Sequence, residues 1–173
     1  MSTRTLGMLA VLAASSLFIP PILTGGNREP VWAWWIPIGS LIAFTATALG
    51  LAWQFKDHIG PLGIVGAILV PGAILVTLGA ATIVGANAAF LAVLPAGSAM
   101  LMWDLGRIGV LSRPASIAHL AAAVTLVIGL AVALLAQGSF ALGLVGGVSY
   151  LLSWIAIGVS LIRGAPRRQA TRA

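Results

Sequence analysis

The stretch MLMWDLGRIGVLSRPASIAH, residues 100–119, holds one of the three acidic residues and one of the two histidines of this chain. Asp104 and Arg107 are three residues apart, so on a helix they share a face and can pair. A histidine oriented by a carboxylate can act as a general base, which makes His119, Asp104 and Arg107 a candidate catalytic site. The other interpretation is a turn between two helices, because Pro114 suits the first turn of a new helix. We favour the turn and assign no catalytic residue.

Weakly polar residues recur at helical spacing in two other segments. Ser40, Thr47 and Gln54 are seven residues apart and so share a helical face, and a stripe of small and hydroxyl residues runs past Tyr150. In lipid, such stripes mark contacts between helices, because backbones approach closely and hydroxyl groups bond across. Helix packing is therefore the interpretation we favour. The alternative is a polar cleft for a small ligand, for which the candidates are Ser40, Thr47, Tyr150, Ser153 and Trp154.

The composition points to a membrane. The chain has 173 residues, of which 60% are hydrophobic and 7% charged, whereas a soluble domain carries about 25% charged residues. We predict a single all-α integral membrane domain, residues 1–173, because a barrel would need alternating polar and apolar positions. The net charge of +6 does not indicate nucleic-acid binding, since the basic residues are scattered over loops and a tail.

Six apolar runs predict six transmembrane helices in a compact bundle, since about 20 residues cross a bilayer. The uncharged stretch 60–103 is about twice the length that one crossing needs, and GAN at 85–87 is the best place for it to turn. His119 would then lie close to the membrane surface, where it meets water or a lipid headgroup. The predicted spans are 5–24, 31–54, 61–84, 88–104, 115–136 and 139–162, followed by a basic tail at 163–173.

The distribution of Lys and Arg orients these spans. With the N-terminus in the cytoplasm, one side collects eight basic residues and the other only Arg28, and cytoplasmic flanks are the basic ones. The eight are Arg4, Lys56, Arg107, Arg113, Arg163, Arg167, Arg168 and Arg172. Both termini are therefore predicted to be cytoplasmic. Because Arg4 precedes an apolar run, cleavage of residues 1–25 as a secretory signal stays open.

Several chemistries have no matching motif. The chain lacks cysteine, which excludes disulfides, thiolate metal sites and iron–sulfur clusters, and it contains neither HExxH nor a P-loop lysine motif. No Asp or Glu lies well inside a span, where ion-coupled carriers usually need one. Ser98 in LPAGSAM is a lone serine with no histidine predicted on its side of the membrane, so a Ser–His hydrolase is not expected. We predict no cofactor and no metal.

In architecture the chain resembles the substrate-binding subunits of some vitamin importers, and Ala10 and Ala14 are similar in kind to the small residues of a helix contact used there. No ligand motif of those subunits matches, so no family is assigned. LVPGA at 69–73 and Pro95 could kink or break helices as in transporters, but Pro and Gly are common in membrane helices in any case, and this is the interpretation we favour. Pro71 within that segment would be the breaking point.

The sequence thus favours a non-catalytic, multi-pass protein of the cell membrane. It would act as a subunit or assembly partner, in contact with the bilayer and with other membrane helices, as a homo-oligomer or a hetero-complex. The alternative is a protein that binds or transports a small molecule or a lipid. A second alternative is a membrane-embedded enzyme with a cytoplasm-facing site. No nucleic-acid partner is expected.

Overall fold

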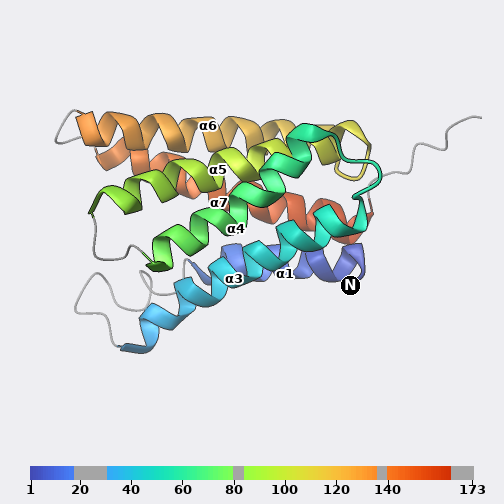
Figure 1. Ribbon diagram of the computed structural model, residues 1–173, viewed down its shortest axis with the longest axis horizontal. Helices are drawn as coiled ribbons and strands as arrows, with labels where there is room; N and C mark the ends of the chain where they lie inside the picture. Colours follow the sequence, from blue (N-terminus) through green and yellow to red (C-terminus); the bar gives the residue numbers. More distant parts are fainter. Residues whose placement is uncertain (18–30, 80–83, 136–139, 165–173) are drawn as a thin grey trace, which may run out of the picture.

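The computed structural model is all-helical, with six α-helices and no strands in the part of the chain that it describes. It describes residues 1–17, 31–79, 84–135 and 140–164, and the side chains within 1–17, 36, 38–75, 92–132 and 142–164. Successive helices run in opposite directions along one bundle axis (Figure 1). The helices are α1 (Thr3–Ser16), α3 (Val31–Gln54), α4 (Pro61–Gly79), α5 (Val84–Arg107), α6 (Arg113–Leu135) and α7 (Phe140–Arg163).

Most helix boundaries agree with the predicted spans, and one turn does not. Residues 85–87, which were expected to form a loop, are helical and belong to the first turn of α5. This helix begins at Val84, and α4 ends at Gly79. Poor helix formers are tolerated there, because the first backbone N–H groups of a helix have no intrahelical acceptor in any case. The second half of the first predicted span, 18–24, lies outside the described residues.

Neither Pro71 nor Pro95 breaks the helix that contains it. Pro71 lies inside α4 and Pro95 inside α5, and both helices continue through them. The alternative that a helix breaks at these two positions therefore does not hold. Pro114 occupies the first turn of α6, as expected for a residue without a backbone N–H.

Two helices are long and apolar enough to cross a membrane, judged by length and composition over the described side chains. Their apolar segments are Arg113–Val132 in α6 and Leu142–Arg163 in α7. The described apolar parts of α3 and α4, Ile38–Gln54 and Pro61–Leu75, are shorter.

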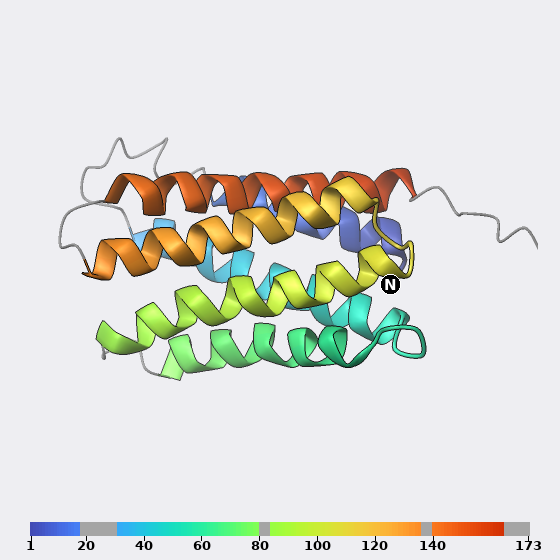
Figure 2. The same ribbon diagram turned by 90° about the horizontal axis from the view of Figure 1, so that it is seen from above.

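Glycines allow the closest helix contacts. A Cβ atom on Gly7 of α1 would lie 2.7 Å from the carbonyl oxygen of Gly158 on α7. A Cβ atom on Gly66 of α4 would lie 2.7 Å from the backbone nitrogen of Leu101 on α5. Since real Cβ atoms do not approach backbone atoms so closely, α1 with α7 and α4 with α5 pack backbone to backbone. Figure 2 shows α4 beside α5 and α6 beside α7.

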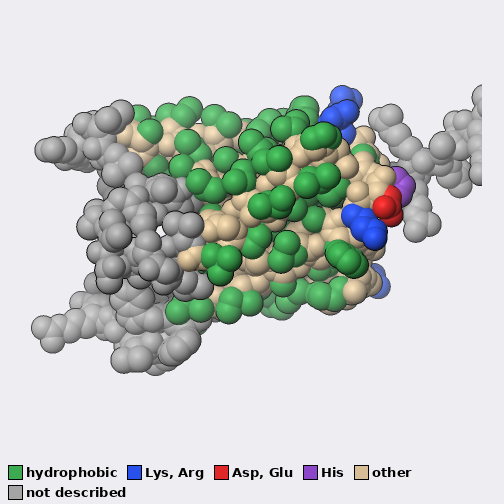
Figure 3. Space-filling model, in the orientation of Figure 1, with side chains coloured by type: hydrophobic (Ala, Val, Ile, Leu, Met, Phe, Trp, Pro, Cys, Tyr) green, Lys and Arg blue, Asp and Glu red, His purple; other side chains and the backbone are tan. Residues whose placement is uncertain are grey.

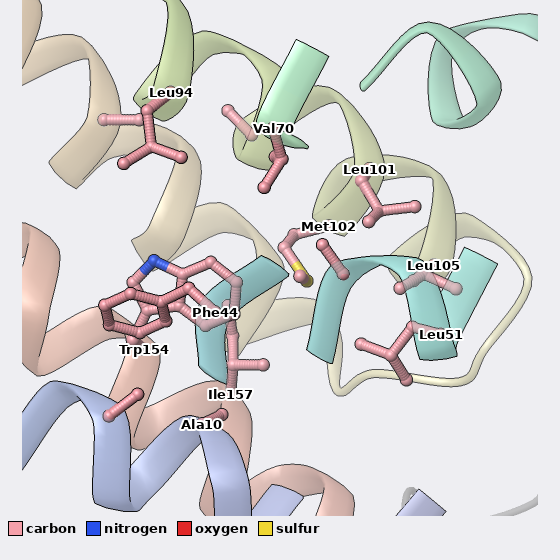
Figure 4. Packing of buried hydrophobic residues seen from close by; sticks show 14 of the residues in the cluster. Ala10, Phe44, Leu51, Val70, Leu94, Leu101, Met102, Leu105, Trp154 and Ile157 are labelled. Atoms are coloured by element: carbon pink, nitrogen blue, oxygen red, sulfur yellow. The ribbon is translucent and has the colours of Figure 1, made fainter. Parts of the chain in front are cut away.

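The apolar core lies between these pairs (Figure 4). Phe44 of α3 packs on Trp154 of α7, with ring centroids 4.7 Å apart. Met102 and Leu105 of α5 face Leu51 of α3, and all three are fully buried. This core fixes the relative positions of α3, α5 and α7, and with them the polar side chains described next.

Candidate functional site

Asp104 is positioned as a cap on α4. Its carboxylate accepts hydrogen bonds from the backbone N–H groups of Gly60 at 2.5 Å and Gly63 at 3.2 Å, at the start of that helix. Arg107 lies 3.5 Å from the other carboxylate oxygen, as its spacing predicted. An anion at a helix N-terminus is favourable, because the free N–H groups there carry partial positive charge. The carboxylate thus joins the α5 end to the start of α4.

His119 lies elsewhere, in the interior of the bundle. The side chain is completely buried, with Nε2 3.0 Å from Ser98 Oγ and Nδ1 2.8 Å from Ser153 Oγ. The expectation that His119 meets water or a headgroup is wrong, because α6 turns this residue toward α5 and α7. Asp104 makes its hydrogen bonds with Gly60, Gly63 and Arg107, so the structure does not bring the three candidate catalytic residues together.

Ser98 is the residue that sequence reasoning missed. Its hydroxyl lies 2.7 Å from Tyr150 Oη as well as 3.0 Å from His119 Nε2, so it is not a lone serine. The position of each residue along its helix could have indicated this contact. Ser98 precedes the end of α5 by nine residues and His119 follows the start of α6 by six. At about 1.5 Å per residue the two lie at similar depths in neighbouring antiparallel helices.

Ser98, His119, Tyr150 and Ser153 therefore form one buried network that links α5, α6 and α7. The serine hydroxyls also contact backbone carbonyls: Ser98 Oγ lies 3.0 Å from the oxygen of Pro95, and Ser153 Oγ lies 2.6 Å from that of Tyr150. All four side chains are at least nine-tenths buried. Their polar atoms are paired with one another and with the backbone, as buried polar atoms require.

The protons of this network can be counted. The contacts are five: two of the imidazole with serines, one of Ser98 with Tyr150, and two of serines with carbonyls. Three hydroxyls and a neutral imidazole supply only four protons. Either tautomer of His119 then leaves one serine–carbonyl contact without a proton. The two tautomers thus correspond to two hydrogen-bonding arrangements, which differ in whether Ser98 or Ser153 donates to the ring.

Aromatic rings enclose the imidazole. The rings of Tyr150 and Trp154 each lie 5.2 Å from that of His119, centroid to centroid. Trp154 Nε1 is buried and forms no hydrogen bond with a described residue. Phe44 packs in turn on Trp154, so aromatic side chains from α3 and α7 surround this part of the network.

The five candidate ligand-binding residues separate into two groups. Tyr150, Ser153 and Trp154 belong to or surround the buried network. Ser40 instead bonds across to Ser16 of α1, with the two hydroxyl oxygens 2.6 Å apart. Thr47 donates to the carbonyl oxygen of Ala43 in its own helix, at 2.8 Å. The shared face of α3 is thus used for packing, and these residues do not line a common cleft.

The described residues form an apolar groove and a larger, partly polar cleft at the surface. An apolar groove of about 460 Å³ runs over α5 and α6, with Leu62 of α4 at its edge, and all its lining side chains are apolar or aromatic. A wider cleft of about 1150 Å³ opens at the end of the bundle where α5 meets α6, and it is lined by charged and hydroxyl residues as well as apolar ones. We call them the apolar groove and the basic cleft. Trp103 lines both, whereas Ser98 and His119 line neither.

Comparison with known proteins gives no relative from which a role could be transferred. No family model, no curated protein and no solved structure matches the chain.

Proposed function

We propose that this chain is a multi-pass protein of the cell membrane, with six spans and both termini in the cytoplasm. The outer faces of the helices support this. Large apolar side chains are exposed there, such as Ile68 at 65%, Leu75 at 70% and Ile128 at 52% exposure. Hydrophobic side chains are spread over the face of the bundle that Figure 3 shows. Soluble proteins rarely expose contiguous apolar surface on this scale. Lipid chains would cover it.

The charged residues support the orientation. Those that the structure describes gather at one end of the bundle (Figure 3), at the starts of α1 and α6, the ends of α5 and α7, and the loop between α3 and α4. Five are basic and two acidic: Arg4, Lys56, Arg107, Arg113 and Arg163, with Asp57 and Asp104. An excess of Lys and Arg marks the cytoplasmic side, so we assign this end to the cytoplasm.

Within the membrane we propose a non-catalytic role, as a subunit or assembly partner of a membrane complex. The observation that supports this is the state of His119. It is fully buried, and both of its ring nitrogens are hydrogen-bonded to serines, so neither nitrogen is open to a substrate. Its contacts hold three helices together. Meanwhile, at Gly39, Gly72 and Gly147, no described atom beyond the glycine's own stretch of helix lies within 4 Å of where a Cβ would stand. Outward small residues of this kind allow a partner helix to approach closely.

The orientation can be tested by cysteine labelling, because the natural chain has no cysteine to remove. A single cysteine at Asp57 or Gly109 should react with a membrane-impermeant maleimide only after the cytoplasmic face is opened. A single cysteine at Asn27 or Ser139 should react from outside in intact cells. Reaction of both pairs from the same side would contradict six spans.

The assembly role can be tested by weighing the protein. After gentle extraction from its native membrane, native mass spectrometry should find it in a larger complex with other chains or with copies of itself. A dispersed monomer across several mild detergents would contradict a subunit role. The mass of any partner chain would name the complex.

An enzyme is the candidate that the Ser98–His119 contact favours, since a serine paired with a histidine is the arrangement of a nucleophile and its base. The same serine is engaged by Tyr150 and the Pro95 carbonyl, and neither cavity reaches it. We therefore expect no labelling of Ser98 by a fluorophosphonate probe in membranes. Labelling that disappears in Ser98→Ala would replace the non-catalytic proposal with a hydrolase.

A further inference from the structure

We propose that the apolar groove and the basic cleft together bind one anionic phospholipid, with an acyl chain along the groove and the phosphate in the cleft. This inference rests on the membrane location proposed above. To that location it adds a bound lipid, the negative charge of its headgroup and its binding position on α5 and α6.

The groove has the chemistry of an acyl-chain site. It is lined by residues within 96–103 of α5 and 120–128 of α6, and these include the small residues Ala96, Ala99 and Ala123. Its volume of about 460 Å³ is within the range of roughly 300–1,000 Å³ that is usual for ligand pockets. No polar side chain other than the Trp103 indole lines it, so a polar ligand would find no partner there.

The cleft has the chemistry of a phosphate site. Arg107 and Arg113 both line it, and they stand on the two sides of the α5–α6 turn. Arg107 is 65% exposed at the side chain and pairs only at 3.5 Å with Asp104. Arg113 forms no ion pair with any residue that the structure describes. A guanidinium of this kind can donate two parallel hydrogen bonds to a phosphate.

Trp103 makes the two cavities one site. It lines both of them, is 39% exposed, and lies one turn before Arg107 on α5. Tryptophan prefers the boundary between hydrocarbon and headgroups, which is where the glycerol of a phospholipid would lie. The surface is apolar on the groove side of Trp103 and basic on the cleft side. Such a surface matches an anionic amphiphile better than a neutral one.

The test uses full-length protein in nanodiscs that contain equal amounts of phosphatidylglycerol and phosphatidylcholine, followed by native mass spectrometry of the lipids that remain bound. We expect one phosphatidylglycerol to be retained in preference to phosphatidylcholine. Arg113→Gln should reduce this retention about fivefold, the factor that corresponds to about 1 kcal/mol for a basic residue near an anionic surface. Arg163→Gln is the matched control, because Arg163 ends α7 at the same end of the bundle but does not line the cleft.

Substitutions in the groove test the acyl chain. Ala96→Phe should fill the groove and lower retention of phosphatidylglycerol, whereas Ala121→Phe, on the exposed face of α6 outside the groove, should not. Equal retention of both lipids, or equal loss in the two arginine variants, would overturn the proposal in favour of general surface attraction. Displacement of the lipid by millimolar inorganic phosphate would also overturn it, because the groove would then contribute nothing. A failure here leaves the cysteine-labelling result intact, so it is distinguishable from a failure of the six-span topology.

Discussion

His119 of α6 and Ser153 of α7 lie 2.8 Å apart, from Nδ1 to Oγ, in the middle of the bundle. This contact and the one from Nε2 to Ser98 on α5 join three helices through a single ring. In a chain with so few polar side chains, the histidine is the centre of the interior rather than part of the turn that precedes it.

Replacement of His119 by Ala should destabilise the protein without any change in topology. The variant loses two interhelical hydrogen bonds, worth on average about 0.6 kcal/mol each in a membrane protein, and leaves a cavity. Together with the cavity, the loss should be roughly 2–4 kcal/mol. Unfolding in mixed micelles measures it. His58→Ala is the control, since His58 is exposed, and equal stability of the two variants would contradict the structural role of His119.

Ser98 and Tyr150 should be energetically coupled. Their hydroxyl oxygens are 2.7 Å apart and buried, so Ser98→Ala and Tyr150→Phe remove the same hydrogen bond. A double-mutant cycle should give a coupling energy near 0.6 kcal/mol, and at most about 1.7 kcal/mol. Strict additivity of the two single changes would mean that this contact contributes nothing to stability.

Gly66→Ala should disturb the packing of α4 on α5. Its new Cβ would stand 2.7 Å from the Leu101 backbone nitrogen, so the two helices would have to separate, at a cost of about 1–3 kcal/mol. Gly72→Ala in the same helix is the matched control. No atom lies within 4 Å of its Cβ position, so its unfolding free energy should stay within about 1 kcal/mol of the parent value. A similar unfolding free energy for the two variants would contradict close packing at position 66.

Asp104→Ala should loosen the start of α4. The variant leaves the N–H groups of Gly60 and Gly63 without their acceptor, and loss of a helix cap costs about 0.5–2 kcal/mol. Amide hydrogen exchange should therefore speed up at residues 60–64 and not elsewhere in α4. Asp57→Ala removes an exposed acid from the adjacent loop and should leave that exchange unchanged. Protection that survives in Asp104→Ala would contradict the capping role.

The sequence by itself determined the helical class and most helix boundaries. Residues 31–54 were predicted as one helix, and α3 has the same bounds. Long apolar runs separated by charged residues or by Gly-containing segments leave little freedom in how such a chain is divided into helices. The Asp104–Arg107 pair was also predictable, since it depends only on local helical spacing. The break in the stretch 60–103 was misplaced because Gly and Asn are compatible with a first turn as well as with a loop.

Tertiary structure decided which polar residues meet. The candidate catalytic site predicted that Asp104 lies beside His119, which follows it in the same short stretch of sequence. Asp104 instead binds the amides of Gly60 and Gly63, more than 40 positions earlier. His119 pairs with Ser98 and Ser153 instead, residues 21 and 34 positions away. Such pairs depend on the rotation of each helix about its axis. That rotation is set by close contacts such as Gly7 with Gly158 and Gly66 with Leu101, and spacing along one helix carries no information about the face that a neighbouring helix presents.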